Sequence, residues 1–175
     1  HDKHAANGLV ILAINVDKER DLAAQFLKQN PARFRVGYDA EGRRAGYVLR
    51  GSASGYADAV SLMCAYEPAT RRLLGLKVLE SRETPGLGDY IDPKKDRNKT
   101  RPWITQFNNL GFDSVPQSKW RVKKDGGRFD QMSGATISAR AVTRASGRTL
   151  AWAVEHKDSL FALPANGRFE EKETP

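Results

Sequence analysis

The sequence predicts an α+β fold, in which a twisted, mostly antiparallel sheet packs against helices. Two observations lead to this prediction. Residues 59–66 and 73–81 have the composition of strands, and a short turn at residues 68–71 separates them, a pattern typical of an antiparallel hairpin. A long run of helical spacing begins near Thr136, after the expected strands. Strands followed by a helix, without regular alternation, indicate an α+β arrangement.

The size and composition of the chain are those of a globular protein. The 175 residues suffice for one domain, or for one domain with an incomplete appendage. Hydrophobic residues make up 39% of the sequence, which supports a core and excludes a disordered chain. The longest apolar run, residues 9–14, is far shorter than the roughly 18 residues of a membrane-spanning helix and predicts a buried strand. We therefore expect any membrane anchor to lie outside this sequence or to come from a partner.

Residues 1–45 form an N-terminal segment to which the sequence assigns no role. After the strand at 9–14 we expect a helix over residues 18–29 and a second strand at 34–38. This βαβ-like order, over residues 8–45, resembles a fragment of a thioredoxin-like domain of the periplasmic thiol–disulfide type. The CxxC motif of such a domain is absent, so thiol–disulfide chemistry is excluded.

A second unit is expected over residues 46–163, followed by a charged tail over residues 164–175. Besides the hairpin and the long helix, its expected elements are a strand at 47–50, a Gly/Ser loop at 51–58, a loop at 83–89, a short helix or strand at 103–107, and a strand at 120–123 with a turn at 124–127. Gly147 is an interior weak point of the long helix, because glycine is a poor helix former.

Positive charge is concentrated in one part of the sequence. The formal net charge is +8, and residues 114–150 alone carry +6, with only Asp125 and Asp130 opposing eight basic residues. These are Lys119, Arg121, Lys123, Lys124, Arg128, Arg140, Arg144 and Arg148. Such a segment attracts phosphate, nucleic acid or anionic lipid. A solvated basic helix face explains the same pattern equally well.

Cysteine and histidine are scarce. The single cysteine, Cys64, excludes an internal disulfide and a thiolate metal cluster, and its place in a strand-like run predicts a small buried hydrophobe. The histidines are His1, His4 and His156, and no combination of His, Cys and carboxylates has metal-ligand spacing. We predict no structural metal and no catalytic acid–base or nucleophile set.

The most informative motif is the run DQMSGAT at residues 130–136, which leads into the long helix. Small residues and hydroxyls at a helix start allow several backbone N–H groups to converge on one anion, which the helix dipole also favours. The simpler interpretation is that Ser133, Thr136 or Ser138 caps the helix. A second loop, ETPGLGD at residues 83–89, places glycines around one apolar residue, Leu87. It is either a site for a flat ligand or an ordinary hairpin turn.

These motifs also carry a resemblance to a known family. The stretches SRETPGLGD at residues 81–89, WRVKKDGG at 120–127 and FDQMSGATISARAV at 129–142 occur in that order. Together they closely resemble the G subunit of the Rnf electron-transport complex, and more widely the C subunit of the sodium-translocating NADH:quinone reductase. The resemblance covers about residues 46–156, most of the chain.

The resemblance implies a covalent flavoprotein with FMN as its cofactor. It implies that FMN is joined through a phosphoester to Thr136, the last residue of the Ser-Gly-Ala-Thr motif, and that a flavin transferase makes this bond by reading Asp130. The same resemblance places Glu83, Thr84, Gly86 and Leu87 beside the isoalloxazine ring. Around the phosphate we expect Ser133, Gly134 and Ala135, with Lys123 or Lys124 as counter-charge and Lys123 taken as the candidate.

The resemblance further implies an electron-transfer subunit of a membrane-bound, ion-translocating oxidoreductase complex. Its partners would be the other subunits of that complex, and its soluble domain would lie on the periplasmic side of a bacterial inner membrane. The N-terminal segment does not resemble the single membrane helix that precedes the soluble part in this family.

Two other functions fit parts of the sequence. One is a flavin-bearing sensor or regulatory domain with the same fold and attachment. The other is a nucleic-acid-binding module that rests on the basic segment, and it ranks last because no aromatic-rich basic sheet or helix-turn-helix accompanies the charge. A serine hydrolase is weaker still, since GSASG at residues 51–55 has Ala53 at the nucleophile position.

Overall fold

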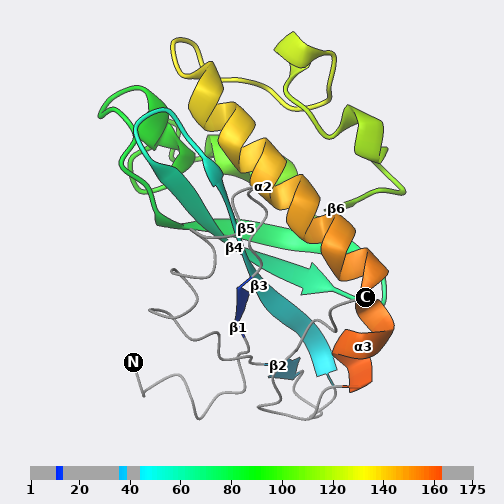
Figure 1. Cartoon of the computed structure of the whole chain (residues 1–175). Helices are drawn as coiled ribbons and strands as arrows, with labels where there is room; N and C mark the ends of the chain where they lie inside the picture. The colour runs from blue at the N-terminus through cyan, green and yellow to red at the C-terminus, as the bar shows by residue number, and fades with distance from the viewer. Residues whose placement is uncertain (1–10, 14–35, 39–43, 163–175) are drawn as a thin grey trace, which may run out of the picture.

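The computed structural model describes residues 11–13, 36–38 and 44–162, which form one sheet with a long helix across it (Figure 1). The sheet contains β1 (Ile11–Ala13), β2 (Val36–Tyr38), β3 (Arg44–Ser54), β4 (Ala59–Glu67), β5 (Arg72–Glu80) and β6 (Leu110–Gly111). The strand order is β1-β3-β4-β5-β6, and β2 also pairs with β3. Among the described strands only β1 pairs in parallel, so the predicted α+β fold with a mostly antiparallel sheet is confirmed.

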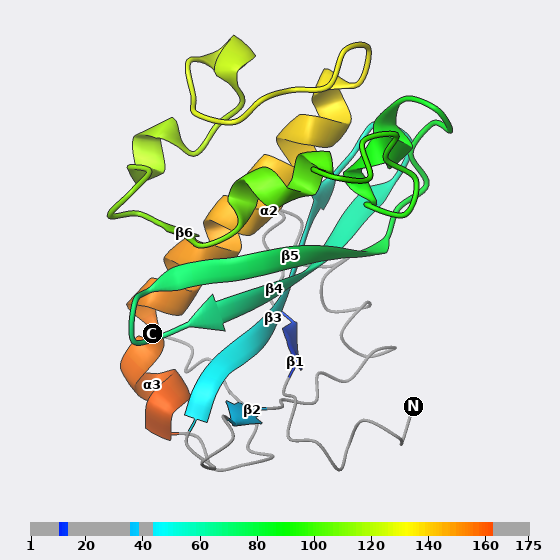
Figure 2. The ribbon, with the colours of Figure 1, turned by 180° about the vertical axis from the view of Figure 1, so that it is seen from behind.

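The described helical elements follow β5 in the chain. They are the 3-10 helices η2 (Gly88–Ile91), η3 (Trp103–Phe107), η4 (Gln117–Lys119) and η5 (Lys123–Asp125), and the α-helices α2 (Thr136–Glu155) and α3 (Lys157–Ala162). Strand β6 lies between η3 and η4 in the chain. Helix α2 lies diagonally across one face of the sheet, over β3 and β4, as both views show (Figures 1 and 2). Within the described part of the chain, no helix combines the length and the apolar composition needed to cross a bilayer.

Several sequence predictions are confirmed at the level of single elements. The hairpin expected at residues 59–66 and 73–81 is β4 and β5, and the long helix begins at Thr136 as predicted. Strands β1 and β2 lie inside the runs predicted at 9–14 and 34–38. The helix expected over residues 18–29 and the charged tail lie outside the described residues.

The prediction of a loop immediately after residue 50 is wrong. Strand β3 continues through residues 51–54, where Gly51 pairs with Leu62 of β4. At Gly51 a Cβ atom would overlap the hydroxyl oxygen of Thr149 and lie 3.3 Å from the carbonyl oxygen of Ala145. The glycine therefore lets α2 approach the strand closely, and its presence does not break the strand.

The prediction of a strand at residues 120–123 is also wrong. This stretch is irregular and passes into η5, with a single bridge between Val122 and Phe129. Trp120 and Val122 are buried and the residues after them are exposed, so the sequence alternates as in a strand. Apart from that single bridge, no described strand pairs with this stretch. Gly126, with φ of 78°, closes the turn that follows.

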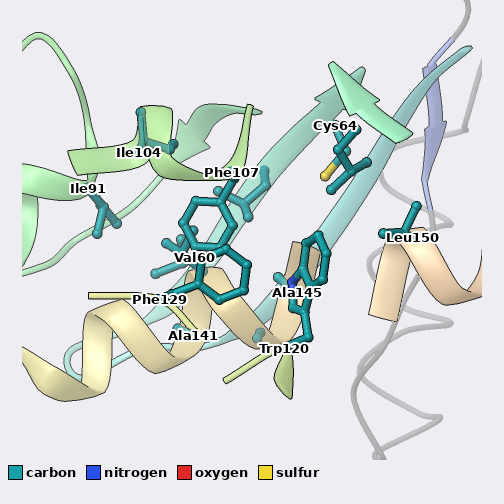
Figure 3. Close-up of a cluster of buried hydrophobic side chains, with 14 of the residues drawn as sticks. Val60, Cys64, Ile91, Ile104, Phe107, Trp120, Phe129, Ala141, Ala145 and Leu150 are labelled. Carbon is teal, nitrogen blue, oxygen red and sulfur yellow. The ribbon is translucent and has the colours of Figure 1, made fainter. Parts of the chain in front are cut away.

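An aromatic cluster fills the space beside α2 (Figure 3). The rings of Phe107 and Phe129 are stacked with centroids 4.3 Å apart, and Trp120 meets Phe129 edge-on at 5.0 Å. The indole N–H of Trp120 donates a hydrogen bond to the hydroxyl of Ser146 on α2 at 3.2 Å. A Cβ at Gly147 would lie 2.5 Å from Trp120 Cδ1, so this glycine accommodates the indole ring.

We predict that Gly147→Ala destabilises the protein. Alanine favours a helix by about 1 kcal/mol over glycine, but its methyl group would overlap Trp120, and overpacking of a core costs about 1–3 kcal/mol. The free energy of unfolding, measured in urea, should therefore fall. In a Trp120→Phe background the same substitution should cost less. A rise in stability for Gly147→Ala alone would contradict the packing argument.

We also predict that Cys64 does not react with thiol reagents in the folded protein. The side chain is fully buried, and desolvation raises the pKa of its thiol to about 12, against a smaller lowering effect of a hydrogen bond with Thr149. Because the thiolate is the nucleophile, labelling at about pH 8 should be negligible until the protein is unfolded. Labelling by an aromatic disulfide, with and without denaturant, measures this. Equal rates in both conditions would contradict the buried placement.

Candidate functional site

The first turn of α2 begins without a side-chain cap. Ala135 occupies the N-cap position, and no side chain of the described residues accepts a hydrogen bond there, so the capping interpretation of Ser133, Thr136 and Ser138 is wrong. The first-turn N–H groups of a 20-residue helix thus keep their capacity for an anion. Thr136, the first helical residue, is half-buried.

A tight turn leads the chain into that helix. The N–H of Ala135 donates to the carbonyl oxygen of Met132 at 3.2 Å, and Gly134 has a φ of 77°. A residue with a side chain is strained at that φ, whereas glycine is not. Ser133 and Gly134 are exposed, and Met132 and Ala135 are buried beneath them. The turn therefore presents its two middle residues to solvent beside Thr136.

The loop of residues 83–89 is compact and internally bonded. The N–H groups of Leu87 and Asp89 donate to the carbonyl oxygen of Thr84 at 3.1 and 3.3 Å, and the N–H of Gly86 donates to Asp89 Oδ1 at 2.9 Å. Residues 84–87 are exposed, while Gly88 and Asp89 are buried. The loop therefore holds Leu87 at the surface on a fixed backbone.

The structure brings the two predicted loops together. A Cβ at Gly134 would lie 3.3 Å from Leu87 Cδ2, so the leucine side chain lies beside the turn that precedes Thr136. Ser138, on the first turn of α2, donates a hydrogen bond to the carboxylate of Glu83. Both views place the loop and the start of α2 at the same end of the molecule (Figures 1 and 2). We call this region the loop–helix junction; it consists of residues 55–57, 83–89 and 132–138.

Glu83 lies beneath the surface of the junction. Its side chain is 4% exposed. One carboxylate oxygen accepts the N–H groups of Tyr56 at 2.9 Å and Ala57 at 3.4 Å, and the other accepts the hydroxyl of Ser138. Both carboxylate oxygens of Glu83 are therefore hydrogen-bonded within the protein. The neighbouring Thr84, Gly86 and Leu87, in contrast, are exposed to solvent.

Two exposed apolar residues of the junction, Tyr56 and Ile137, were not predicted from the sequence as site residues. In the described part of the chain, the large hydrophobic side chains with the greatest exposure are Tyr56 at 69%, Leu74 at 45%, and Leu87 and Ile137 at 44% each. Three of these four belong to the junction. The signals were an aromatic residue inside a Gly/Ser loop and an isoleucine directly after the helix-starting threonine. The exposed apolar side chains described by the structure are therefore concentrated at the junction.

Asp130 and Lys123 form an ion pair close to the same turn. Lys123 Nζ lies 2.6 Å from Asp130 Oδ1, and both side chains are more than half exposed. The backbone of Asp130 is fixed by η3: its N–H donates to Gln106 Oε1 at 2.7 Å, and its carbonyl accepts the indole N–H of Trp103 at 2.8 Å. The lysine predicted as a counter-charge is thus bonded to the aspartate predicted as a recognition residue.

The basic segment borders a groove of about 390 Å³. Its lining residues come from the irregular stretch and from α2: Trp120, Arg121, Val122, Asp125, Arg140, Thr143 and Arg144. The guanidinium group of Arg140 donates two hydrogen bonds, of 2.7 and 2.5 Å, to the carboxylate of Asp125. That hydrogen bonding, more than the charges of Arg140, Arg121 and Lys124, holds the pKa of Asp125 below its ordinary value. Part of the positive charge is therefore neutralised locally.

With this geometry established, comparison with known proteins defines the class of the chain. A family model described as the FMN-binding domain matches residues 55–151, more than half of the sequence. The chain belongs to this family. The matched range includes both predicted loops and most of α2.

Among individual proteins, the chain is similar to the G subunit of the ion-translocating oxidoreductase complex. It is 38% identical over 122 residues to that of Pseudomonas aeruginosa strain UCBPP-PA14, covering 69% of this chain and 54% of the relative. To that of Shewanella piezotolerans it is 43% identical over 94 residues, covering 54% and 42%. The chain thus spans about half the length of the curated relatives it matches. The resemblance inferred from the motifs is confirmed.

The fold has a counterpart among solved structures. The crystal structure of Shewanella oneidensis NqrC matches with a TM-score of 0.50 and 23% sequence identity, over 69% of this chain and 59% of that one. At this identity the likeness is one of fold.

We predict that Arg140→Gln raises the pKa of Asp125 toward its ordinary value. The hydrogen bond from Arg140 is the largest cause of the lowered value. A carboxyl group with a lowered folded-state pKa contributes stability above its unfolded pKa, and that contribution is lost as the pH falls through the folded value. An NMR titration of the Asp125 carboxyl measures the shift. Arg144→Gln, at the same groove, is the control; an equal shift there would contradict the assignment to Arg140.

Proposed function

We propose that this chain carries FMN, linked by a phosphoester to Thr136, and acts as an electron-transfer subunit. The observation that carries the proposal is the position of Thr136. It is the first residue of a long helix without a side-chain cap, beside an exposed apolar loop. Membership of the FMN-binding domain family supports the identity of the cofactor.

The surroundings of Thr136 fit a phosphate diester. The ester retains one negative charge, and first-turn N–H groups and the helix dipole stabilise charge at that place. Ser133, Gly134 and Ala135 form the tight turn that opens this space. We assign Lys123 as the counter-charge of the phosphate. Its ammonium group forms an ion pair with Asp130, close to the turn that precedes Thr136. These residues would hold the phosphate without any acid–base group.

The apolar part of the junction fits a flat ring. We assign Thr84, Gly86 and Leu87 as ring neighbours, because they form the exposed part of a rigid loop. Tyr56 and Ile137 are the other exposed large apolar residues of the junction. Glu83 belongs to the same site, but with both carboxylate oxygens bonded to the protein it would act from beneath the loop.

In such a site the flavin supplies the electron chemistry, and the protein supplies binding, orientation and electrostatics. We propose that the chain relays electrons within an ion-translocating oxidoreductase complex, as the names of its relatives suggest. Its partners would be other subunits of that complex, at the bacterial inner membrane and with this domain on the periplasmic side. A flavin transferase that reads Asp130, an exposed residue on a fixed backbone, would attach the cofactor.

We predict that Thr136→Ala abolishes covalent flavin attachment. Protein produced together with a flavin transferase should be yellow after denaturation and should show a mass increment of one phosphoester-linked FMN. The substitution removes the hydroxyl of residue 136 and should remove both signals. Intact mass and visible absorbance of the denatured protein measure this.

Ser133→Ala is the matched control, since it removes an exposed hydroxyl three residues away and leaves Thr136 in place. It should keep the covalent flavin. Attachment that survives Thr136→Ala but is lost in Ser133→Ala would show that the bond lies at the serine. A wild-type chain that stays colourless and unmodified with an active transferase would overturn the proposed function.

A further inference from the structure

A buried polar contact joins three separate parts of the loop–helix junction. The carboxylate of Glu83 binds the backbone N–H groups of Tyr56 and Ala57 in the β3–β4 loop and the hydroxyl of Ser138 on α2. Ser138 is 1% exposed, and Glu83 is 4% exposed. Charged hydrogen bonds in such surroundings are stronger than neutral ones, and a buried carboxylate requires them. This contact is the polar centre of the junction.

Two glycines make room for the contact. At Gly55 a Cβ atom would overlap one carboxylate oxygen of Glu83, and at Gly88 a Cβ atom would overlap the hydroxyl of Ser138. At Gly88 the same atom would also lie 2.9 Å from the second carboxylate oxygen of Glu83. Any side chain at these two positions would push the partners apart. The glycines, the acid and the serine therefore form one unit.

We propose that Ser138 and Glu83 are positioning residues, which fix the surface loop of residues 84–87 against the turn that precedes Thr136. The loop is tied to the sheet through Glu83 and the β3–β4 loop, and to α2 through Ser138. Leu87 is thereby held beside Gly134, two residues from Thr136. Without the hydrogen bond between Ser138 and Glu83, the loop would lose the side-chain hydrogen bond that ties it to α2.

This arrangement bears on the proposed cofactor, and that consequence rests on the proposed function. A tether at Thr136 fixes only the phosphate end of a flavin and leaves the ring free to swing. The loop of residues 84–87 would set where the ring comes to rest. The Ser138–Glu83 contact would then determine ring orientation without touching the ring.

The first test is amide hydrogen exchange, followed by NMR, on the chain produced without a transferase. Ser138→Ala should speed exchange at Leu87 and Tyr56 by about tenfold, the size expected when a hydrogen bond to a charged group is lost. Glu83→Ala should do the same. In Glu83→Gln the exchange rates of these amides should stay close to those of the wild-type protein. The glutamine carbonyl oxygen can accept from Tyr56 and Ala57 while its amide group donates to Ser138.

Ser146→Ala is the matched control. Ser146 is also a buried serine of α2 and accepts a hydrogen bond from Trp120, away from the junction. It should leave exchange at Leu87 and Tyr56 unchanged. The proposal is overturned if Ser138→Ala leaves these amides unchanged or if Ser146→Ala accelerates them equally. Should Ser138→Ala fail to fold, the contrast between Glu83→Ala and Glu83→Gln decides the matter.

A second measurement uses flavin-loaded protein. Ser138→Ala should alter the visible spectrum and the midpoint potential of the attached flavin, whereas Ser146→Ala should not. An unaltered spectrum and potential in Ser138→Ala would overturn the positioning of the ring. If no flavin attaches to any variant but the exchange results hold, the junction stands and only the cofactor assignment fails.

Discussion

The close approach of α2 to the sheet is the interaction on which the rest of this structure depends. The buried face of the helix is made largely of small residues, and it packs over β3 and β4. Gly51 on β3 removes the side chain that would collide with Thr149, and Gly147 on α2 receives the ring of Trp120. Small residues on both sides thus allow dense packing of a long helix on a short sheet. This packing fixes where the helix begins.

The position of the site follows from that packing. A helix held along its length presents its first turn at a fixed place, and here that place is the end of the sheet where the β3–β4 loop and the loop after β5 also lie. The uncapped N–H groups and the exposed apolar loop are consequently neighbours although they are far apart in the chain. The irregular stretch from Trp120 to Phe129 adds support from the other side, through aromatic packing and the backbone bonds of Asp130. The uncapped first turn of α2 and an exposed apolar loop therefore meet at one junction.

The sequence predicted the parts of this arrangement that depend on local pattern. The hairpin and the helix start at Thr136 were readable from periodicity and turn residues, and the pairing of the two loops came only with the family resemblance. The length of β3 was not readable, because Gly51 resembles a loop residue until the helix above it is known. Residues 120–123 were predicted to form a strand, whereas Trp120 and Val122 are buried in an irregular segment. The burial of Glu83 depends on Gly55 and Gly88, whose relation is purely tertiary.

Attachment and orientation of a tethered ligand make different physical demands, and under the proposed function different residues of the junction would meet them. Attachment needs one nucleophilic oxygen and a place for one negative charge, and Thr136 at the start of α2 would supply both. Orientation needs a rigid surface, and an exposed loop is rigid only if something beneath it is fixed. The buried carboxylate of Glu83 meets that need because its oxygens bind groups from the sheet side and the helix side together. The carboxylate of Glu83 therefore links the sheet side of the junction to the helix side, and under the proposed function it would act on the ligand through the loop above it.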